Sequence, residues 1–103
     1  MSTAKELIDE LVKRFKPEQA KDWDRIINWT ISGSGWHMII KDQKCEVKEG
    51  KHESPNLEVE TDIDTLSKVL KGEVDVVSVF MAGKLKAKGP MSDLMKLREV
   101  FGF

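Results

Sequence analysis

Five short segments of this sequence alternate apolar and polar side chains, the pattern of β-strands with one buried and one solvated face. They lie at residues 25–32, 36–41, 45–48, 57–61 and 84–88. Their polar faces carry the charged residues Lys41, Glu46, Lys48, Glu58, Glu60, Lys84, Lys86 and Lys88. A sheet of this kind must bury its apolar face under helices. The pattern therefore predicts an antiparallel-rich sheet with helices on one face, in an α+β two-layer sandwich.

The helices expected to cover this sheet are marked by their first residues. Thr3 and Glu6 fit a capping box at the start of an amphipathic helix. Thr61 fits the N-cap of a second helix. Asp75 fits the cap of a short third helix, although the β-branched residues after it suit a strand equally well. Residues 91–101 have the pattern of a C-terminal amphipathic helix.

The charge balance argues against nucleic acid as a partner. Seventeen basic and eighteen acidic residues give a formal net charge of -1 at pH 7, whereas nucleic-acid binding usually needs a basic excess on one face. No stretch approaches the roughly 20 apolar residues that span a bilayer, and the N-terminal residues lack the apolar core of a secretion signal. We therefore expect one cytoplasmic domain over residues 1–103.

No set of side chains has the spacing of a catalytic or metal site. His37 and His52 lack cysteine or carboxylate partners at ligand spacing. Ser34 lies in a hairpin turn between two strands, where a nucleophile elbow would join a strand to a helix. Cys45 falls on the inward parity of its strand, as a small buried hydrophobe would. We expect no enzymatic activity, no cofactor and no metal.

The C-terminal helix carries more apolar surface than is needed to cover a sheet. Its apolar residues are Met91, Leu94, Met95, Leu97, Val100 and Phe101. Four of the five methionines, Met38, Met81, Met91 and Met95, fall between the predicted layers, and methionine suits surfaces that accept ligands of varied shape. On periodicity alone, completion of the core or burial in a dimer is the simpler interpretation.

Residues 57–97 carry motifs in a characteristic order. An extended segment, an acidic-capped helix and a short apolar segment precede FMAGKLKAKG at residues 80–89, and a methionine-bearing helix follows. This order resembles the sterol carrier protein type 2 (SCP-2 sterol transfer) family. The resemblance implies a five-stranded, mostly antiparallel sheet, helices on one face and a hydrophobic tunnel between the layers. It also implies that the segment after Asp75 is helical.

The resemblance also provides candidate ligand-binding residues. Carried over position by position, they are Phe80, Met81, Leu85, Met91, Leu94, Met95 and Leu97. The inward parity of the sheet adds Trp36, Met38 and Val59. Phe101, on the apolar face of the last helix, completes the set.

The family implies a non-catalytic protein that binds and transfers an apolar lipid: a fatty acid, a fatty acyl-CoA, a sterol or an isoprenoid. Entry of so large a ligand needs a gate, and we expect the last helix to provide it. We further expect transient membrane contact and a monomer or weak homodimer. The alternative is an interaction or dimerisation module that buries the same apolar C-terminal face, as an accessory to a lipid-handling enzyme.

Overall fold

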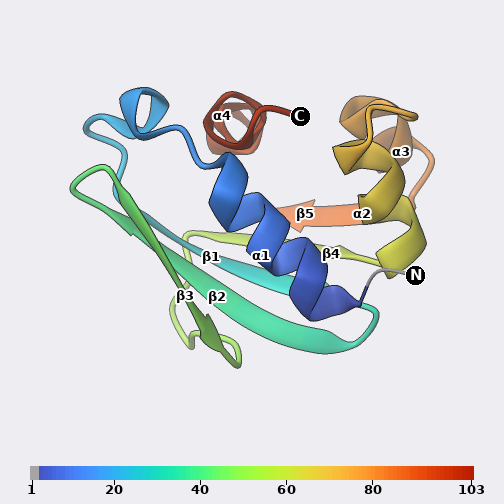
Figure 1. The fold of residues 1–103 in the computed structure, drawn as a ribbon, viewed down its shortest axis with the longest axis horizontal. Helices are drawn as coiled ribbons and strands as arrows, with labels where there is room; N and C mark the ends of the chain where they lie inside the picture. Colours follow the sequence, from blue (N-terminus) through green and yellow to red (C-terminus); the bar gives the residue numbers. More distant parts are fainter. Residues whose placement is uncertain (1–2) are drawn as a thin grey trace.

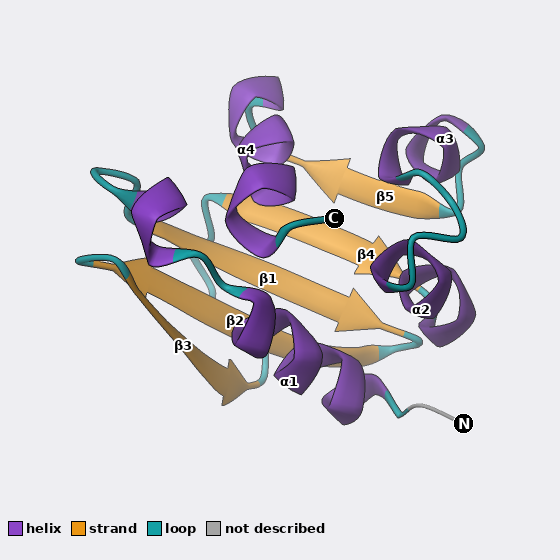
Figure 2. Cartoon of the chain, turned by 45° about the horizontal axis from the view of Figure 1, so that its top comes forward, coloured by secondary structure: helices purple, strands orange, loops and turns teal. Residues whose placement is uncertain are grey.

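The computed structural model describes residues 3–103 and has the predicted α+β two-layer architecture. Within these residues, a five-stranded sheet in the order β3-β2-β1-β4-β5 is covered on one face by four α-helices (Figure 1, Figure 2). The strands are β1 Arg25–Ile31, β2 Ser34–Lys41, β3 Lys44–Glu49, β4 Leu57–Thr61 and β5 Leu85–Lys88. The helices are α1 Ala4–Arg14, α2 Ile63–Leu70, α3 Val76–Met81 and α4 Met91–Phe101, with a short 3-10 helix at Pro17–Ala20.

The strand register explains the alternating pattern of the sequence. The sheet is mostly antiparallel, as predicted, because only the β1–β4 pair among the described strands is parallel. Alternate side chains face the helices, and Trp29 of β1 is fully buried there. On the outer face, Glu58 lies directly opposite Lys88, and Glu60 lies opposite Lys86. The lysines of edge strand β5 are therefore matched by the acidic residues of β4.

The connection from β3 to β4 covers part of the outer face, which the sequence pattern did not predict. Asn28 has the parity of a solvent-facing residue but is 3% exposed. Its side-chain oxygen accepts the backbone N–H of His52 at 2.8 Å, and its side-chain nitrogen donates to the His52 carbonyl at 2.9 Å. The expectation that Asn28 faces water was wrong, because the chain leaving β3 has to pass β2 and β1 to reach β4.

We expect Asn28→Ala to lower the free energy of unfolding by about 1–3 kcal/mol, because it removes the hydrogen-bond partners of both backbone groups of the half-buried His52. Urea unfolding measures this loss, and limited proteolysis should show faster cleavage within residues 50–56. Thr30→Ala is the matched control, two residues along the same face of β1. Equal stability of the two variants would contradict the structural role given to Asn28.

The helix starts follow the predicted caps with one exception. Thr3 and Glu6 form the predicted capping box, with both reciprocal hydrogen bonds at 3.1 Å. Asp75 caps α3 and thereby establishes that segment as a helix. The N-cap of α2 is Asp62, which accepts a backbone N–H of the first turn at 2.7 Å. The expectation of Thr61 in this role was wrong, because Thr61 still belongs to β4 and its hydroxyl donates to a backbone carbonyl before β5.

Candidate functional site

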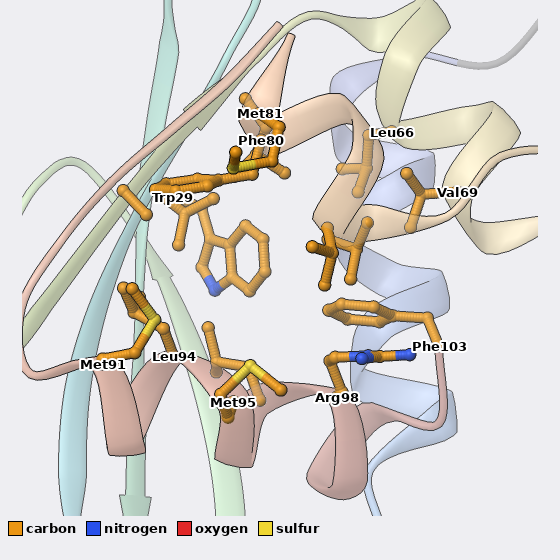
Figure 3. Close-up of a pocket in the computed structure, with 16 residues that line it drawn as sticks. Trp29, Leu66, Val69, Phe80, Met81, Met91, Leu94, Met95, Arg98 and Phe103 are labelled. Atoms are coloured by element: carbon orange, nitrogen blue, oxygen red, sulfur yellow. The ribbon is translucent and has the colours of Figure 1, made fainter. Parts of the chain in front are cut away.

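An apolar pocket lies between the sheet and the three helices α2, α3 and α4 (Figure 3). Its volume is about 180 Å³. The lining residues are Trp29, Val59, Leu66, Val69, Val76, Val77, Phe80, Met81, Leu85, Ala87, Met91, Leu94, Met95, Leu97, Arg98 and Phe103. Arg98 is the one charged residue among those that the structure describes in this lining. Such a surface favours an apolar ligand over a polar one.

Eight of the eleven candidate residues from the sequence line this pocket. They are Val59, Phe80, Met81, Leu85, Met91, Leu94, Met95 and Leu97. They come from β4, α3, β5 and α4, so the fold brings together residues that lie up to about forty positions apart in the chain. The motif over residues 80–89 and the methionine-bearing helix thus form two walls of one pocket.

Trp36, Met38 and Phe101 lie outside the pocket, contrary to expectation. Trp36 and Met38 face inward but belong to β2, which is separated from β4 by β1. Phe101 is fully buried behind the pocket, where its ring packs edge-on against that of Trp29 with 6.2 Å between centroids. Inward parity identified the correct face of the sheet, but it could not distinguish the part under α1 from the part under α3.

The sequence interpretation missed eight lining residues. They are Trp29, Leu66, Val69, Val76, Val77, Ala87, Arg98 and Phe103. Trp29 and Ala87 are the neighbours of Val59 on β1 and β5, so the strand order would have identified them. Leu66 and Val69 belong to the buried stripe of α2, which looked like ordinary core in the sequence.

The mouth of the pocket lies between α3 and α4. Val77 and Met81 of α3 and Met91 and Met95 of α4 are the large apolar side chains that remain exposed among the described residues, and all four line the pocket. Met81 is 78% exposed. The exposed apolar surface is therefore concentrated at one opening, and most of it consists of flexible methionines. No helix within residues 3–103 is long and apolar enough to cross a membrane.

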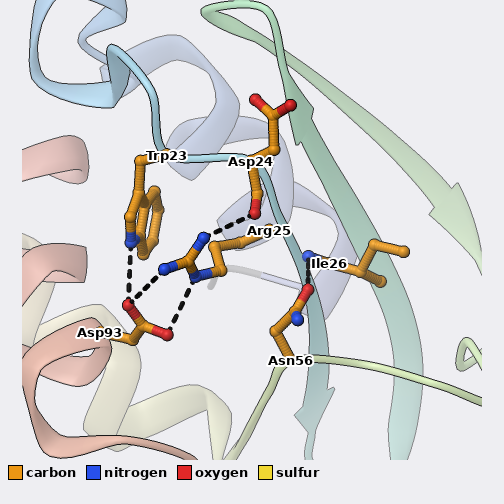
Figure 4. A network of polar contacts seen from close by, with 6 residues as sticks. All are labelled: Trp23, Asp24, Arg25, Ile26, Asn56 and Asp93. Atoms are coloured by element: carbon orange, nitrogen blue, oxygen red, sulfur yellow. Dashed lines mark hydrogen bonds and ion pairs between the residues drawn. The ribbon is translucent and has the colours of Figure 1, made fainter.

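Helix α4 is fixed to the rest of the fold at both ends. In its first turn, Asp93 accepts the indole N–H of Trp23 at 2.9 Å and two guanidinium N–H groups of Arg25 at 2.9 and 3.1 Å (Figure 4). At its last turn, the carbonyl of Val100 accepts the backbone N–H of Lys16 at 2.8 Å. These contacts do not favour α4 as the mobile gate that the sequence suggested.

Asp93 is buried, and its hydrogen bonds keep it ionised. The hydrogen bonds from Arg25 lower the pKa of the Asp93 carboxyl group, and the Trp23 N–H lowers it further, although burial by itself would raise it. The ionised form therefore stabilises the fold at pH values above the ordinary carboxyl pKa of about 4. This contribution is lost as the pH falls through the lower pKa of the folded state.

We expect the free energy of unfolding to decrease on acidification below about pH 4, and Asp93→Asn to weaken that dependence. Some dependence should remain, because the pKa of Asp62 is also lowered, mainly by the backbone N–H of Thr65. Urea unfolding of both proteins between about pH 2.5 and 7 measures the effect. Asp64→Asn, which changes an exposed carboxylate on α2, serves as the control. Parallel pH profiles for wild type and Asp93→Asn would contradict the assignment.

Helix α3 is held less firmly than α4. Val79 is its one buried residue. Across the mouth, the guanidinium of Arg98 in α4 lies 3.5 Å from the carboxylate of Asp75, the N-cap of α3. Both side chains are more than a third exposed, and a surface ion pair of this kind contributes only about 0–1 kcal/mol. Separation of α3 from α4 should therefore cost little free energy.

Cys45, His37 and His52, the other residues considered for chemistry in the sequence, lie outside the pocket. Burial raises the pKa of the Cys45 thiol to about 11, so the thiol stays protonated at neutral pH. The His37 ring packs edge-on against that of His52, and its Nδ1 lies 2.8 Å from the carbonyl oxygen of Gly50. Within residues 3–103, no group of three or more His, Cys, Asp or Glu residues is placed to hold a metal ion.

The chain is thus a small α+β sandwich with an apolar pocket between its layers. Comparison with known proteins gives its family. Residues 5–102 match the SCP-2 sterol transfer family. The chain therefore belongs to this family, and the resemblance that residues 57–97 indicated is confirmed.

Solved structures share this fold, and a curated relative is similar in sequence. Palmitated SCP2L2 from Aedes aegypti has a TM-score of 0.79 and 18% identity, covering 99% of this chain and 96% of that one. The sec-alkylsulfatase Pisa1 from Pseudomonas sp. has a TM-score of 0.84 and 16% identity, covering 97% of this chain and 16% of that chain. Hydroxysteroid dehydrogenase-like protein 2 from Xenopus laevis is 26% identical over 105 residues. That match covers 98% of this chain but 25% of the relative, so this chain spans about a quarter of the relative's length.

Proposed function

We propose that this protein binds one apolar lipid in the pocket and carries it without chemical change. The observation that carries the proposal is the pocket lining, which is apolar except for Arg98 and opens between exposed methionines. Membership of the SCP-2 sterol transfer family supports lipid binding or transfer. The palmitated state of SCP2L2 supports a fatty acyl chain among the candidates, beside fatty acyl-CoA, sterols and isoprenoids.

The driving force is the removal of the lipid's hydrocarbon from water. At about 0.8 kcal/mol per methylene, a sixteen-carbon chain provides on the order of 12 kcal/mol before the costs of ordering are subtracted. Ligand pockets usually have volumes of about 300–1,000 Å³, so a cavity of about 180 Å³ has to enlarge to hold a whole lipid. We infer that α3 moves outward to provide this space, because its hold on α4 is weak.

The exposed side chains at the mouth of the pocket also suggest how a ligand enters. Met81, Met91 and Met95 stand at the mouth, where they can contact the apolar part of a membrane or micelle during transfer. The eight predicted residues that line the pocket are the candidate ligand contacts.

Mass spectrometry of the purified protein tests the proposal. Under native conditions we expect a mass above that of the chain, and organic extraction should release one lipid per protein. The extracted molecule also identifies the lipid class. A protein that is purified empty and fails to bind cis-parinaric acid, a fluorescent fatty acid, would contradict lipid carriage.

The same exposed side chains at the mouth favour a second candidate function, that of an interaction or dimerisation module. Val77, Met81, Met91 and Met95 form an apolar surface that a second copy of the chain could cover. Sedimentation velocity at micromolar concentration separates the two functions. A stable dimer that excludes cis-parinaric acid supports the module, whereas a monomer that binds the probe supports the carrier.

A further inference from the structure

A buried hydrogen-bond donor without a partner lies in the wall of the apolar pocket. The indole nitrogen of Trp29 is the one buried side-chain nitrogen or oxygen that lacks a hydrogen-bond partner among the described residues. Trp29 is 1% exposed, and its side chain lines the pocket. Figure 3 shows the indole in the middle of the pocket, with its nitrogen on the side of Leu94 and Met95.

The position of this N–H is unusual because buried polar groups are nearly always satisfied. The indole N–H of Trp23, for comparison, donates to Asp93 at 2.9 Å. Burial of an N–H without an acceptor opposes folding, since the group loses its hydrogen bond to water. The N–H of Trp29 is left without a partner at the place where a ligand would lie.

A water molecule is a poor partner for Trp29. A buried water usually makes two to four hydrogen bonds, about three on average. Apart from Trp29 itself, Arg98 is the one lining residue in the described structure with a polar side chain, and Arg98 is paired with Asp75 at the mouth. A water beside the indole would therefore lack most of its own partners, and an acceptor atom within an apolar ligand fits better.

The acceptor should be uncharged. A carboxylate placed beside Trp29 would be buried, and the one positive charge in the described lining, that of Arg98, is more than a third exposed and therefore screened by water. A carbonyl oxygen needs only one donor and no counter-charge, whereas a hydroxyl would bring an O–H donor for which the described lining has no side-chain oxygen acceptor. An anionic head group, in contrast, would be better placed at the mouth and in water.

We propose that Trp29 donates a hydrogen bond to an uncharged carbonyl oxygen within the apolar body of the ligand. The inference rests on the proposed lipid-binding function and specifies its ligand class. A ligand whose buried part is pure hydrocarbon should therefore bind less tightly than a similar ligand with one buried carbonyl oxygen. Trp29 thus selects for one polar atom, while the remaining lining selects for apolar surface.

Matched small probes test the inference. The probes are n-octane and the linear octanones with the carbonyl at the second, third or fourth carbon, so that the oxygen samples several depths. Affinities are measured by displacement of cis-parinaric acid, for wild type and for Trp29→Phe. The phenylalanine variant keeps an aromatic ring and removes the N–H. Trp36→Phe, on β2 outside the pocket, is the matched control.

We expect the affinity ratio of the best octanone to octane to be about three- to tenfold higher in wild type than in Trp29→Phe, as one hydrogen bond would produce. Trp36→Phe should leave the ratio unchanged. In a nitrogen-proton correlation spectrum of wild type, the Trp29 indole proton should move downfield with the octanone but not with octane. This spectrum decides the question even if Trp29→Phe fails to fold.

Two results would overturn the inference. Binding of octane and all octanones, with the same ratio in both proteins or the same indole shift, would show that Trp29 donates to no ligand. The proposed lipid-binding function would survive that result. Failure of every probe to displace bound cis-parinaric acid would likewise overturn the inference alone. Failure of cis-parinaric acid itself to bind would remove the proposed function on which the inference rests.

Discussion

Ala87→Phe is expected to weaken the binding of cis-parinaric acid at least about tenfold while the fold is retained. Ala87 lies on β5 directly opposite Val59 of β4, and both side chains line the pocket. A phenyl ring at this position would occupy much of a cavity of about 180 Å³. Because the ring enters an existing apolar space, the free energy of unfolding should change by less than about 1.5 kcal/mol. Fluorescence titration and urea unfolding measure the two quantities.

Lys86→Phe is the matched control for this experiment. It introduces the same side chain one residue earlier on the same strand, where alternation directs it to the outer face. We expect its affinity for the probe to equal that of wild type. If Ala87→Phe also binds like wild type, the lipid does not occupy the space between β5 and α4.

Asp93→Ala is expected to lower the free energy of unfolding by about 2–4 kcal/mol. The substitution leaves the buried indole N–H of Trp23 without an acceptor, and it removes the carboxylate that the guanidinium of Arg25 contacts. Small domains have a total stability of about 5–15 kcal/mol, so this is a large share. Thermal unfolding should show a decrease in Tm of roughly 10–20 °C.

Two further variants separate the causes of this loss. Asp93→Asn keeps an oxygen that can accept the Trp23 N–H, and it should cost less than the alanine variant. Ser92→Ala, at an exposed position beside it, should be within about 0.5 kcal/mol of wild type. A loss below about 1 kcal/mol for Asp93→Ala would mean that the hydrogen bonds of Asp93 contribute little to the anchoring of α4.

Local sequence patterns predicted the secondary structure well because their causes are local. The capping box of Thr3 and Glu6, the cap at Asp75 and the alternation in residues 57–61 depend on neighbours within a few positions. The one-residue error at Thr61 arose because two adjacent residues can both cap a helix. The pairing of β4 with β5 distinguishes them, because the Thr61 hydroxyl donates to the backbone carbonyl before β5 and so keeps Thr61 in the strand.

The site was predicted less completely because it depends on which elements become neighbours. Trp36 and Met38 have the same inward parity as Val59, but strand order places them on the other side of β1. Asp93 was not among the candidate residues, because a charged side chain at a helix start does not by itself indicate burial. Its partners Trp23 and Arg25 are about seventy positions away in the chain, and no local pattern predicts contacts over that separation.

The single parallel pairing between described strands, β1 with β4, has a consequence for the order of folding. Strands β1, β2 and β3 follow one another through tight turns, so their contacts close short loops. The pairing of β1 with β4 joins residues about thirty positions apart, and the closing of longer loops is slower. We therefore expect the three-stranded meander to form first and the half that contains α2, α3 and β5 to dock onto it. The apolar walls of the pocket then remain in water until the final step, when a lipid present during synthesis could meet them.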